Sequence, residues 1–127
     1  MAFTLSVRSK QRLEGVHPDL VRVVEKALTL SQIDFAVVEG LRTKARQAEL
    51  MAAGASKTMN SRHITGHAVD VAPVIGGKIR WDWPLFNELA TAFKLAATQE
   101  NVPIVWGGDW VSFKDGPHFE LDRRKYP

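Results

Sequence analysis

The sequence predicts an α+β fold with a small, mainly antiparallel sheet flanked by helices. Two long segments, residues 18–30 and 83–99, carry apolar side chains at helical spacing and have a proline near their start. Four apolar runs have the length of strands: residues 35–38, 68–74, 103–106 and 118–121. Because the helices and strands do not alternate in the strand–helix–strand rhythm of a parallel sheet, the α+β class is favoured.

The first half of the chain is expected to hold three helices and one strand. Ser9 is placed to cap a short helix that reaches residue 13, and Pro18 suits the first turn of the helix that follows. The β-branched run at 35–38 ends at a glycine and predicts a strand. Thr43 then has the residue type of an N-cap, which predicts a helix over residues 44–53.

The second half is expected to hold the rest of the sheet and the longest helix. Residues 55–65 are polar and irregular, which predicts a loop before the strand at 68–74. Gly76-Gly77 then predicts a hairpin turn into a short strand at 78–80. The helix over 83–99 buries one apolar face, and two short strands follow it.

Composition limits the chemistry. The 127 residues are expected to form a single catalytic domain over 1–127, and the absence of cysteine excludes disulfides and thiolate metal sites. Any metal must therefore bind to His, Asp or Glu. The N-terminus lacks the apolar core of a signal peptide, so we expect synthesis in the cytoplasm and action elsewhere only after release. A net charge of +3 without a basic stripe argues against a nucleic-acid binder.

Asp70 is the most informative polar residue, because it lies inside the apolar run Ala68-Val69-Asp70-Val71-Ala72. A carboxylate there is unfavourable unless it is hydrogen-bonded, paired or bound to a metal. Two interpretations stay open: a metal site that Asp70 shares with His63, or an Asp70 bonded to backbone donors with His63 on the surface. We do not expect His63 and His67 to form a helical H-E-x-x-H pair, because Gly66 lies between them and no Glu follows His63.

A third ligand is available in the segment Lys114-Asp115-Gly116-Pro117-His118. His118 opens a predicted strand, and the Gly-Pro turn before it can place Asp115 on the same side. Two His and one Asp are typical of catalytic zinc, which keeps a position open for water, whereas structural zinc usually has four ligands. His17, at a helix start, is expected to have a structural or surface role.

Five motifs, in their order along the chain, resemble those of the family of zinc D-Ala-D-Ala carboxypeptidases and phage L-alanyl-D-glutamate endopeptidases, especially the small phage endolysins. The resemblance implies a fold like that of hedgehog and the D,D-peptidases. The motifs are S-x-x-R-L-x-G-V-H-P-x-L at 9–20, G-L-R-T at 40–43, S-x-H-x-x-G-x-A-x-D at 61–70, W-G-G-D-W at 106–110 and P-H-F-E-L at 117–121.

The resemblance also implies roles for individual residues. His63, Asp70 and His118 match the zinc ligands, and Asp115 matches the acid/base. Arg42 matches an arginine with which the carboxypeptidase branch steadies the reacting carbonyl. The implied protein is a zinc-dependent endolysin, a monomer that hydrolyses the L-Ala–D-Glu bond of the peptidoglycan stem peptide for host cell lysis, with no membrane insertion.

Some alternatives remain open at this level. The same scaffold serves D-Ala-D-Ala carboxypeptidases and dipeptidases, and it can persist as a non-catalytic wall-binding module. Glu120 either orients a ligand or pairs with a basic residue, and Ser61 either bonds near the metal or only shapes the loop. Cleft and structural roles are both open for the remaining candidates: His67, Trp106, Asp109 and Trp110.

Overall fold

The sheet is antiparallel at every pairing in the computed structural model, which describes residues 3–56, 59 and 61–127. Its main path runs in the order β1-β2-β5-β4, and a short β3 pairs with β2 as a hairpin. The predicted α+β class with a mainly antiparallel sheet is confirmed. The strands are β1 (Asp34–Glu39), β2 (Ala68–Ile75), β3 (Lys78–Ile79), β4 (Ile104–Trp106) and β5 (His118–Leu121).

The first helix begins earlier than predicted. α1 (Val7–Arg12) is capped by Ser6, whose hydroxyl accepts a hydrogen bond from the backbone N–H of Ser9 at 3.1 Å. Ser9, the predicted cap, is instead buried inside the helix, and its hydroxyl accepts a bond from the N–H of Val37 in β1 at 3.0 Å. Ser9 therefore joins the helix to the sheet.

The other helices follow the sequence signals closely. His17 caps α2 (Pro18–Leu30) by accepting a bond from the N–H of Asp19, which gives it the structural role expected. Thr43 caps α3 (Lys44–Ala52), as predicted. α4 (Trp83–Glu100) ends at Asn101, whose left-handed backbone stops the helix. A 3-10 turn, η1 (Gly107–Asp109), follows β4.

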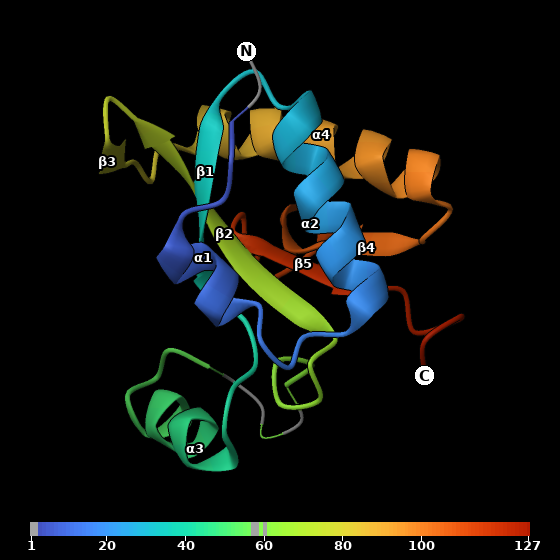
Figure 1. Cartoon of the computed structure of the whole chain (residues 1–127). Helices are drawn as coiled ribbons and strands as arrows, with labels where there is room; N and C mark the ends of the chain where they lie inside the picture. The colour runs from blue at the N-terminus through green and yellow to red at the C-terminus, as the bar shows by residue number, and fades with distance from the viewer. Residues whose placement is uncertain (1–2, 57–58, 60) are drawn as a thin grey trace.

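Alternation along the strands gives the sheet two different faces. On β5, Phe119 and Leu121 enter the hydrophobic core, while His118 and Glu120 point to the opposite face. The core unites the apolar sides of α2 and α4 with one side of the sheet, and the ring of Phe93 from α4 stacks on Phe119 at 4.0 Å. Figure 1 shows α3 apart from the two long helices, at the lower left of the view below α1.

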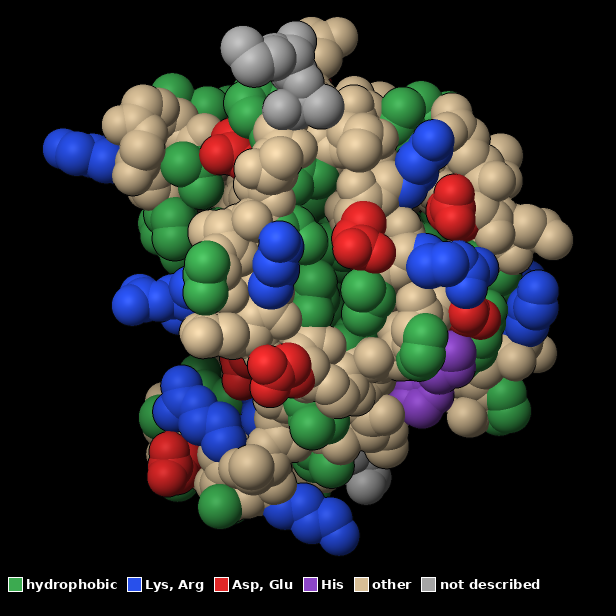
Figure 2. All heavy atoms as spheres, in the orientation of Figure 1, with side chains coloured by type: hydrophobic (Ala, Val, Ile, Leu, Met, Phe, Trp, Pro, Cys, Tyr) green, Lys and Arg blue, Asp and Glu red, His purple; other side chains and the backbone are tan. Residues whose placement is uncertain are grey.

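Charges of both signs are mixed on the face of the molecule that Figure 2 shows. Acidic and basic side chains are interspersed there, without a continuous basic stripe. Among the helices in the described part of the chain, none has both the length and the apolar character needed to cross a membrane.

Candidate active site

Strand register brings two of the predicted site residues together. Asp70 on β2 pairs directly with His118 on β5, so both side chains leave the same face of the sheet at neighbouring positions. On the other side of β2, the pairing with β1 is irregular between Val37 and Glu39, and Glu39 also lies opposite Asp70. Glu39, Asp70 and His118 therefore lie side by side across three neighbouring strands.

His63 reaches this point from the loop before β2. Gly66 has a positive φ of 76°, and a Cβ there would collide with the backbone of Gly15, so the turn needs glycine. The Ser61 hydroxyl accepts a bond from the N–H of His63, and the carbonyl of His63 accepts one from the N–H of Arg42 at 2.9 Å. These contacts hold the loop, and the buried imidazole of His63, over the sheet.

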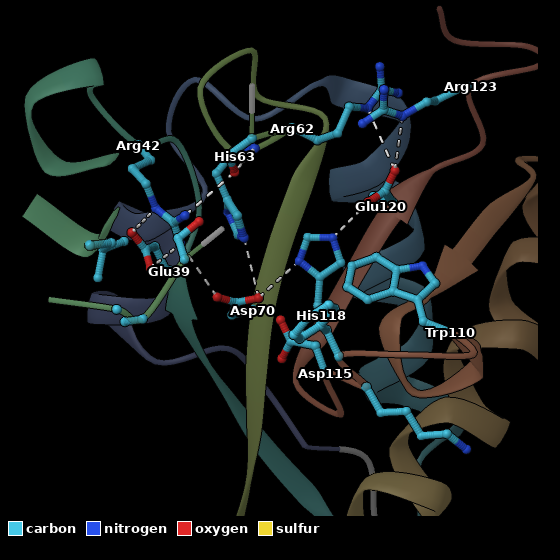
Figure 3. Close-up of a pocket in the computed structure, with 17 residues that line it drawn as sticks. Glu39, Arg42, Arg62, His63, Asp70, Trp110, Asp115, His118, Glu120 and Arg123 are labelled. Carbon is cyan, nitrogen blue, oxygen red and sulfur yellow. Dashed lines mark hydrogen bonds and ion pairs between the residues drawn. The ribbon is translucent and has the colours of Figure 1, made fainter. Parts of the chain in front are cut away.

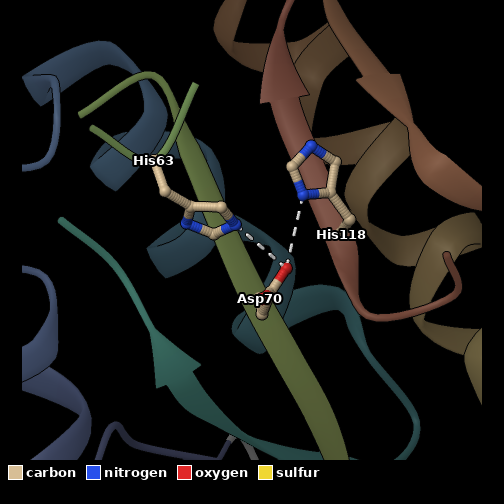
Figure 4. Close-up of side chains that lie close together, drawn as sticks. All are labelled: His63, Asp70 and His118. Carbon is tan, nitrogen blue, oxygen red and sulfur yellow. Dashed lines mark ion pairs between the residues drawn. The ribbon is translucent and has the colours of Figure 1, made fainter. Parts of the chain in front are cut away.

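Three potential metal-binding atoms converge, one each from His63, Asp70 and His118 (Figure 4). His63 Nε2 and His118 Nδ1 each lie 3.3 Å from Asp70 Oδ1. The other ring nitrogens are occupied: His63 Nδ1 lies 2.9 Å from the Gly40 carbonyl, and His118 Nε2 lies 2.8 Å from Glu120 Oε1. Since only N–H groups can bond to these oxygens, the nitrogens that face Asp70 are left with lone pairs in the neutral rings.

Asp70 Oδ1 is buried and has no hydrogen-bond partner in the described part of the chain. Two nitrogen lone pairs and a carboxylate oxygen repel one another unless a cation lies between them, which is the environment that a divalent metal supplies. The residues thus fit a metal with nitrogen and oxygen ligands. Sequence reasoning left open a backbone-bonded Asp70 with His63 on the surface, but here His63 is buried beside Asp70.

The electrostatics follow from the same contacts. Burial opposes ionisation of Asp70, but His118 and His63 outweigh it and hold the pKa of Asp70 well below its usual range. Burial likewise opposes protonation of His118, yet the carboxylates of Asp70 and Glu120 beside its ring raise its pKa to about 9. A metal that binds through His118 Nδ1 must therefore displace a proton from this ring.

Asp115 is held at the edge of this group by a tight turn. Its N–H donates to the carbonyl of Gly107 at 3.0 Å, and its own carbonyl accepts from the N–H of His118 at 3.2 Å. A Cβ at Gly107 would collide with the Asp115 carbonyl, so the close approach requires glycine. Burial, together with the negative charge of Asp70, raises the pKa of Asp115.

Arg42 lies beside Asp70 and is itself firmly held. Its Nε and Nη2 atoms bond to the two carboxylate oxygens of Glu39 at 2.7 Å, and Nη1 bonds to Gln47 Oε1 at 2.7 Å. Nη2 also faces Asp70 Oδ2 at 3.8 Å. Arg42 is thus a fixed positive charge in the wall of the site.

All five predicted catalytic and metal residues line one cleft of about 690 Å³ (Figure 3). The cleft also includes Ser61, Glu120 and Trp110, whose ring lies 5.0 Å from that of His118. Of the residues whose role the sequence left open, Ser61, Glu120 and Trp110 therefore lie at the cleft. His67, Trp106 and Asp109 do not line it: the ring of His67 lies 5.7 Å from that of His17, Trp106 is buried in the core, and Asp109 pairs with Lys94.

Sequence reasoning missed two cleft residues that carry much of the local charge, Glu39 and Arg62. Glu39 holds Arg42, and Arg62 lies 3.8 Å from Glu120 Oε2. In the sequence, only their positions beside predicted functional residues could have indicated a role at the site. Glu39 directly precedes the G-L-R-T motif, and Arg62 directly precedes His63.

Comparisons with known proteins agree on one kind of protein. The family model described as phage L-alanyl-D-glutamate peptidase matches residues 1–125. The L-alanyl-D-glutamate peptidase of Escherichia phage T5 is 38% identical over 130 residues, which cover 99% of this chain and 94% of that protein. The peptidoglycan L-alanyl-D-glutamate endopeptidase CwlK of Bacillus subtilis is 32% identical over 70% of this chain and 61% of its own length.

A solved structure extends the agreement to three dimensions. The crystal structure of the Serratia marcescens L-Ala D-Glu endopeptidase ChiX is similar with a TM-score of 0.93 and 48% sequence identity. The match covers 99% of this chain and 95% of that one.

Proposed function

Because the chain belongs to the phage L-alanyl-D-glutamate peptidase family, we propose that it is a zinc-dependent peptidase that hydrolyses the L-Ala–D-Glu bond of the peptidoglycan stem peptide. One observation carries the chemical part of this proposal. The lone-pair atoms of His63, Asp70 and His118 converge in an open cleft, and a half-buried Asp115 stands beside them.

His63, Asp70 and His118 would hold the metal through Nε2, a carboxylate oxygen and Nδ1. Zinc fits two imidazoles and one carboxylate, and when bound it supplies a Lewis acid that makes water nucleophilic near neutral pH. Three protein ligands leave room for water and substrate, which a structural site with four protein ligands does not.

Asp115 would act as the general base and then as the general acid. It accepts the proton that water loses as the water oxygen adds to the carbonyl carbon of L-Ala. It then gives this proton to the nitrogen of D-Glu as the C–N bond breaks, so that a free carboxyl and a free amine result. The raised pKa of Asp115 supports this role, because proton transfer is most efficient when the pKa of the group lies near the working pH.

Arg42 would stabilise the negative charge that develops on the carbonyl oxygen. Its bonds to Glu39 and Gln47 fix the guanidinium before substrate arrives. A charge held in place needs no reorganisation as the reaction proceeds, which is how preorganised groups lower a barrier. In this role Arg42 acts through its field, since most of its N–H groups are already engaged.

We further propose that residues 1–127 work as one catalytic domain and as a monomer that reaches the cell wall after release from the cytoplasm. The continuity of the core supports one unit, as does the bond at 2.7 Å from the Tyr126 hydroxyl to Asp19, which joins the C-terminal segment to α2.

The test is digestion of purified Gram-negative-type sacculi followed by mass analysis of the fragments. We expect free stem peptides that begin at D-Glu, glycan strands that end in L-Ala, and no new reducing sugar ends. Release of single D-Ala residues from uncut stems would instead identify a carboxypeptidase. Binding to sacculi without any cleavage would identify a wall-binding module.

A further inference from the structure

The Glu120 carboxylate contacts one of the two ring nitrogens of His118. It leaves β5 on the same face as His118, two residues away, and its carboxylate is buried with 8% of the residue exposed. Glu120 Oε1 lies 2.8 Å from His118 Nε2, which keeps a proton on that nitrogen. The lone pair is then on Nδ1, the nitrogen 3.3 Å from Asp70.

Arg62 links this carboxylate to the loop of the other histidine. It is the chain neighbour of His63, and its side chain is only 10% exposed. Its Nη2 atom donates to the carbonyls of Leu121 at 3.1 Å and Tyr126 at 2.7 Å, while Nε points toward Glu120 Oε2 at 3.8 Å. One guanidinium therefore connects the His63 loop, the end of β5 and the C-terminal segment. Figure 3 shows its approach to Glu120.

The position of Arg62 is not explained by packing alone. Its Nε is buried without a hydrogen-bond partner in the described part of the chain, and such a charged donor is unfavourable unless a nearby anion compensates it. The second oxygen of Glu120 is that anion, so Arg62 and Glu120 depend on each other.

Arg123 provides an internal comparison. Its Nε lies 3.7 Å from the same Glu120 oxygen, so its distance matches that of Arg62. Its side chain, however, is 65% exposed, so solvent screens its charge and permits other positions. The two arginines offer Glu120 similar charges at similar distances, but only Arg62 also holds the loop of His63.

We propose that Arg62 and Glu120 are a positioning pair that sets the tautomer of His118 and its spacing from His63, and so preassembles the metal site. This inference rests on the proposed function, because it concerns the same metal. Groups that hold metal-binding histidines from behind typically change metal affinity by about 10–100-fold when they are removed.

The experiment measures the zinc dissociation constant of the purified full chain by competition with a chromophoric chelator. Arg62→Met and Glu120→Ala should each weaken zinc binding about 10–100-fold. Glu120→Gln should weaken it less, because an amide oxygen still accepts the Nε2 proton. Arg123→Met, the matched control, should bind zinc as the wild type does.

A second measurement reports the tautomer directly. In nitrogen NMR spectra of the metal-free wild type above the His118 pKa of about 9, where the ring is neutral, His118 should carry its proton on Nε2, and Glu120→Ala should populate both tautomers. Thermal unfolding in excess chelator checks the fold. If Arg62→Met does not fold, Arg62→Lys replaces it, since an ammonium can bond to the C-terminal carbonyls but not reach Glu120 at the same time.

The outcomes separate the two proposals. A wild type that binds no zinc would overturn the proposed function itself. A wild type that binds zinc, with equal affinity in Arg62→Met and Glu120→Ala, would overturn only the positioning role. Equal weakening by Arg62→Met and Arg123→Met would also overturn it, because charge on Glu120 would then suffice.

Discussion

The two faces of the sheet are built from alternate residues of the same strands, yet they are stabilised in opposite ways. On the core face, Val69, Val71 and Phe119 are fully buried among apolar side chains. On the cleft face, Asp70 and His118 lie beside specific polar partners, and Asp70 Oδ1 has no hydrogen-bond partner among the residues that the structure describes. The core face is stabilised by apolar contacts alone, whereas the cleft face carries a group that could hold a metal ion.

This difference determines how each face responds to change. An apolar core loses stability in proportion to the contacts removed and tolerates replacements of similar volume. A converging set of ligands has no such tolerance, because the loss of one partner leaves charges unpaired in a buried place. Substitutions on the core face should therefore reduce stability, and those on the cleft face should mainly reduce activity or metal binding.

Removal of metal should have the largest effect on activity. We expect a strong chelator to abolish hydrolysis of sacculi and added zinc to restore it, because we propose that His63, Asp70 and His118 hold the zinc ion. The chelated protein should still unfold cooperatively, at a lower temperature, since the core contains none of the three. Full activity in chelator, with no zinc found by metal analysis, would contradict the proposed difference between the core face and the cleft face of the sheet.

Asp115→Asn should have the next largest effect. Asparagine keeps the size of the side chain but cannot exchange a proton, so turnover should fall about 10²–10⁴-fold, the usual contribution of a general acid/base. Zinc content and thermal stability should stay close to the wild type, because Asp115 is outside the three-residue group. If turnover is unchanged, Glu120 becomes the next candidate for the acid/base.

Phe93→Ala tests the core face of the sheet, against which Phe93 packs. Phe93 is fully buried and stacks on Phe119, so its truncation should lower the free energy of unfolding by about 3–5 kcal/mol, as measured by denaturant titration. Well below its melting temperature, the variant should keep wild-type zinc affinity and near wild-type turnover.

Phe93→Leu is the matched control and should be less destabilising, because it leaves a smaller cavity. A loss of zinc affinity in either variant, at a temperature where both are folded, would mean that the two faces are coupled through the strands.

The sequence predicted the elements well because their signals are local. Pro18, Thr43 and the alternation in β5 each depend on a few neighbouring residues. The helix start at Ser6 was missed because Ser6 and Ser9 are both suitable caps, and only the contact of Ser9 with Val37 decides between them.

The convergence of site residues was predictable as a pattern, but the supporting contacts were not. Arg62 reaches Tyr126, 64 residues away, and this contact depends on how β5 and the C-terminal segment lie over the loop. Trp106 and Trp110 have the same side chain and flank the same glycine pair, yet the 3-10 turn between them sends one to the core and the other to the cleft.

Trp106→Phe should have the smallest effect on stability and activity among these changes. It tests how far the core face and the cleft face are independent, because Trp106 contacts both. Its ring belongs to the core, while its Nε1 donates to the carbonyl of Gly116 at 2.7 Å, in the turn that carries Asp115 and His118. Phenylalanine keeps most of the apolar contact but leaves this carbonyl without its partner, so we expect a loss of about 1–3 kcal/mol in the free energy of unfolding.

Turnover of Trp106→Phe should fall modestly, because the turn that holds Asp115 loosens. Zinc affinity should change little, since the pairing of Asp70 with His118 remains. Denaturant titration, turnover and chelator competition on the same preparation measure the three quantities. Wild-type turnover together with the full loss of stability would mean that Trp106 serves the core alone.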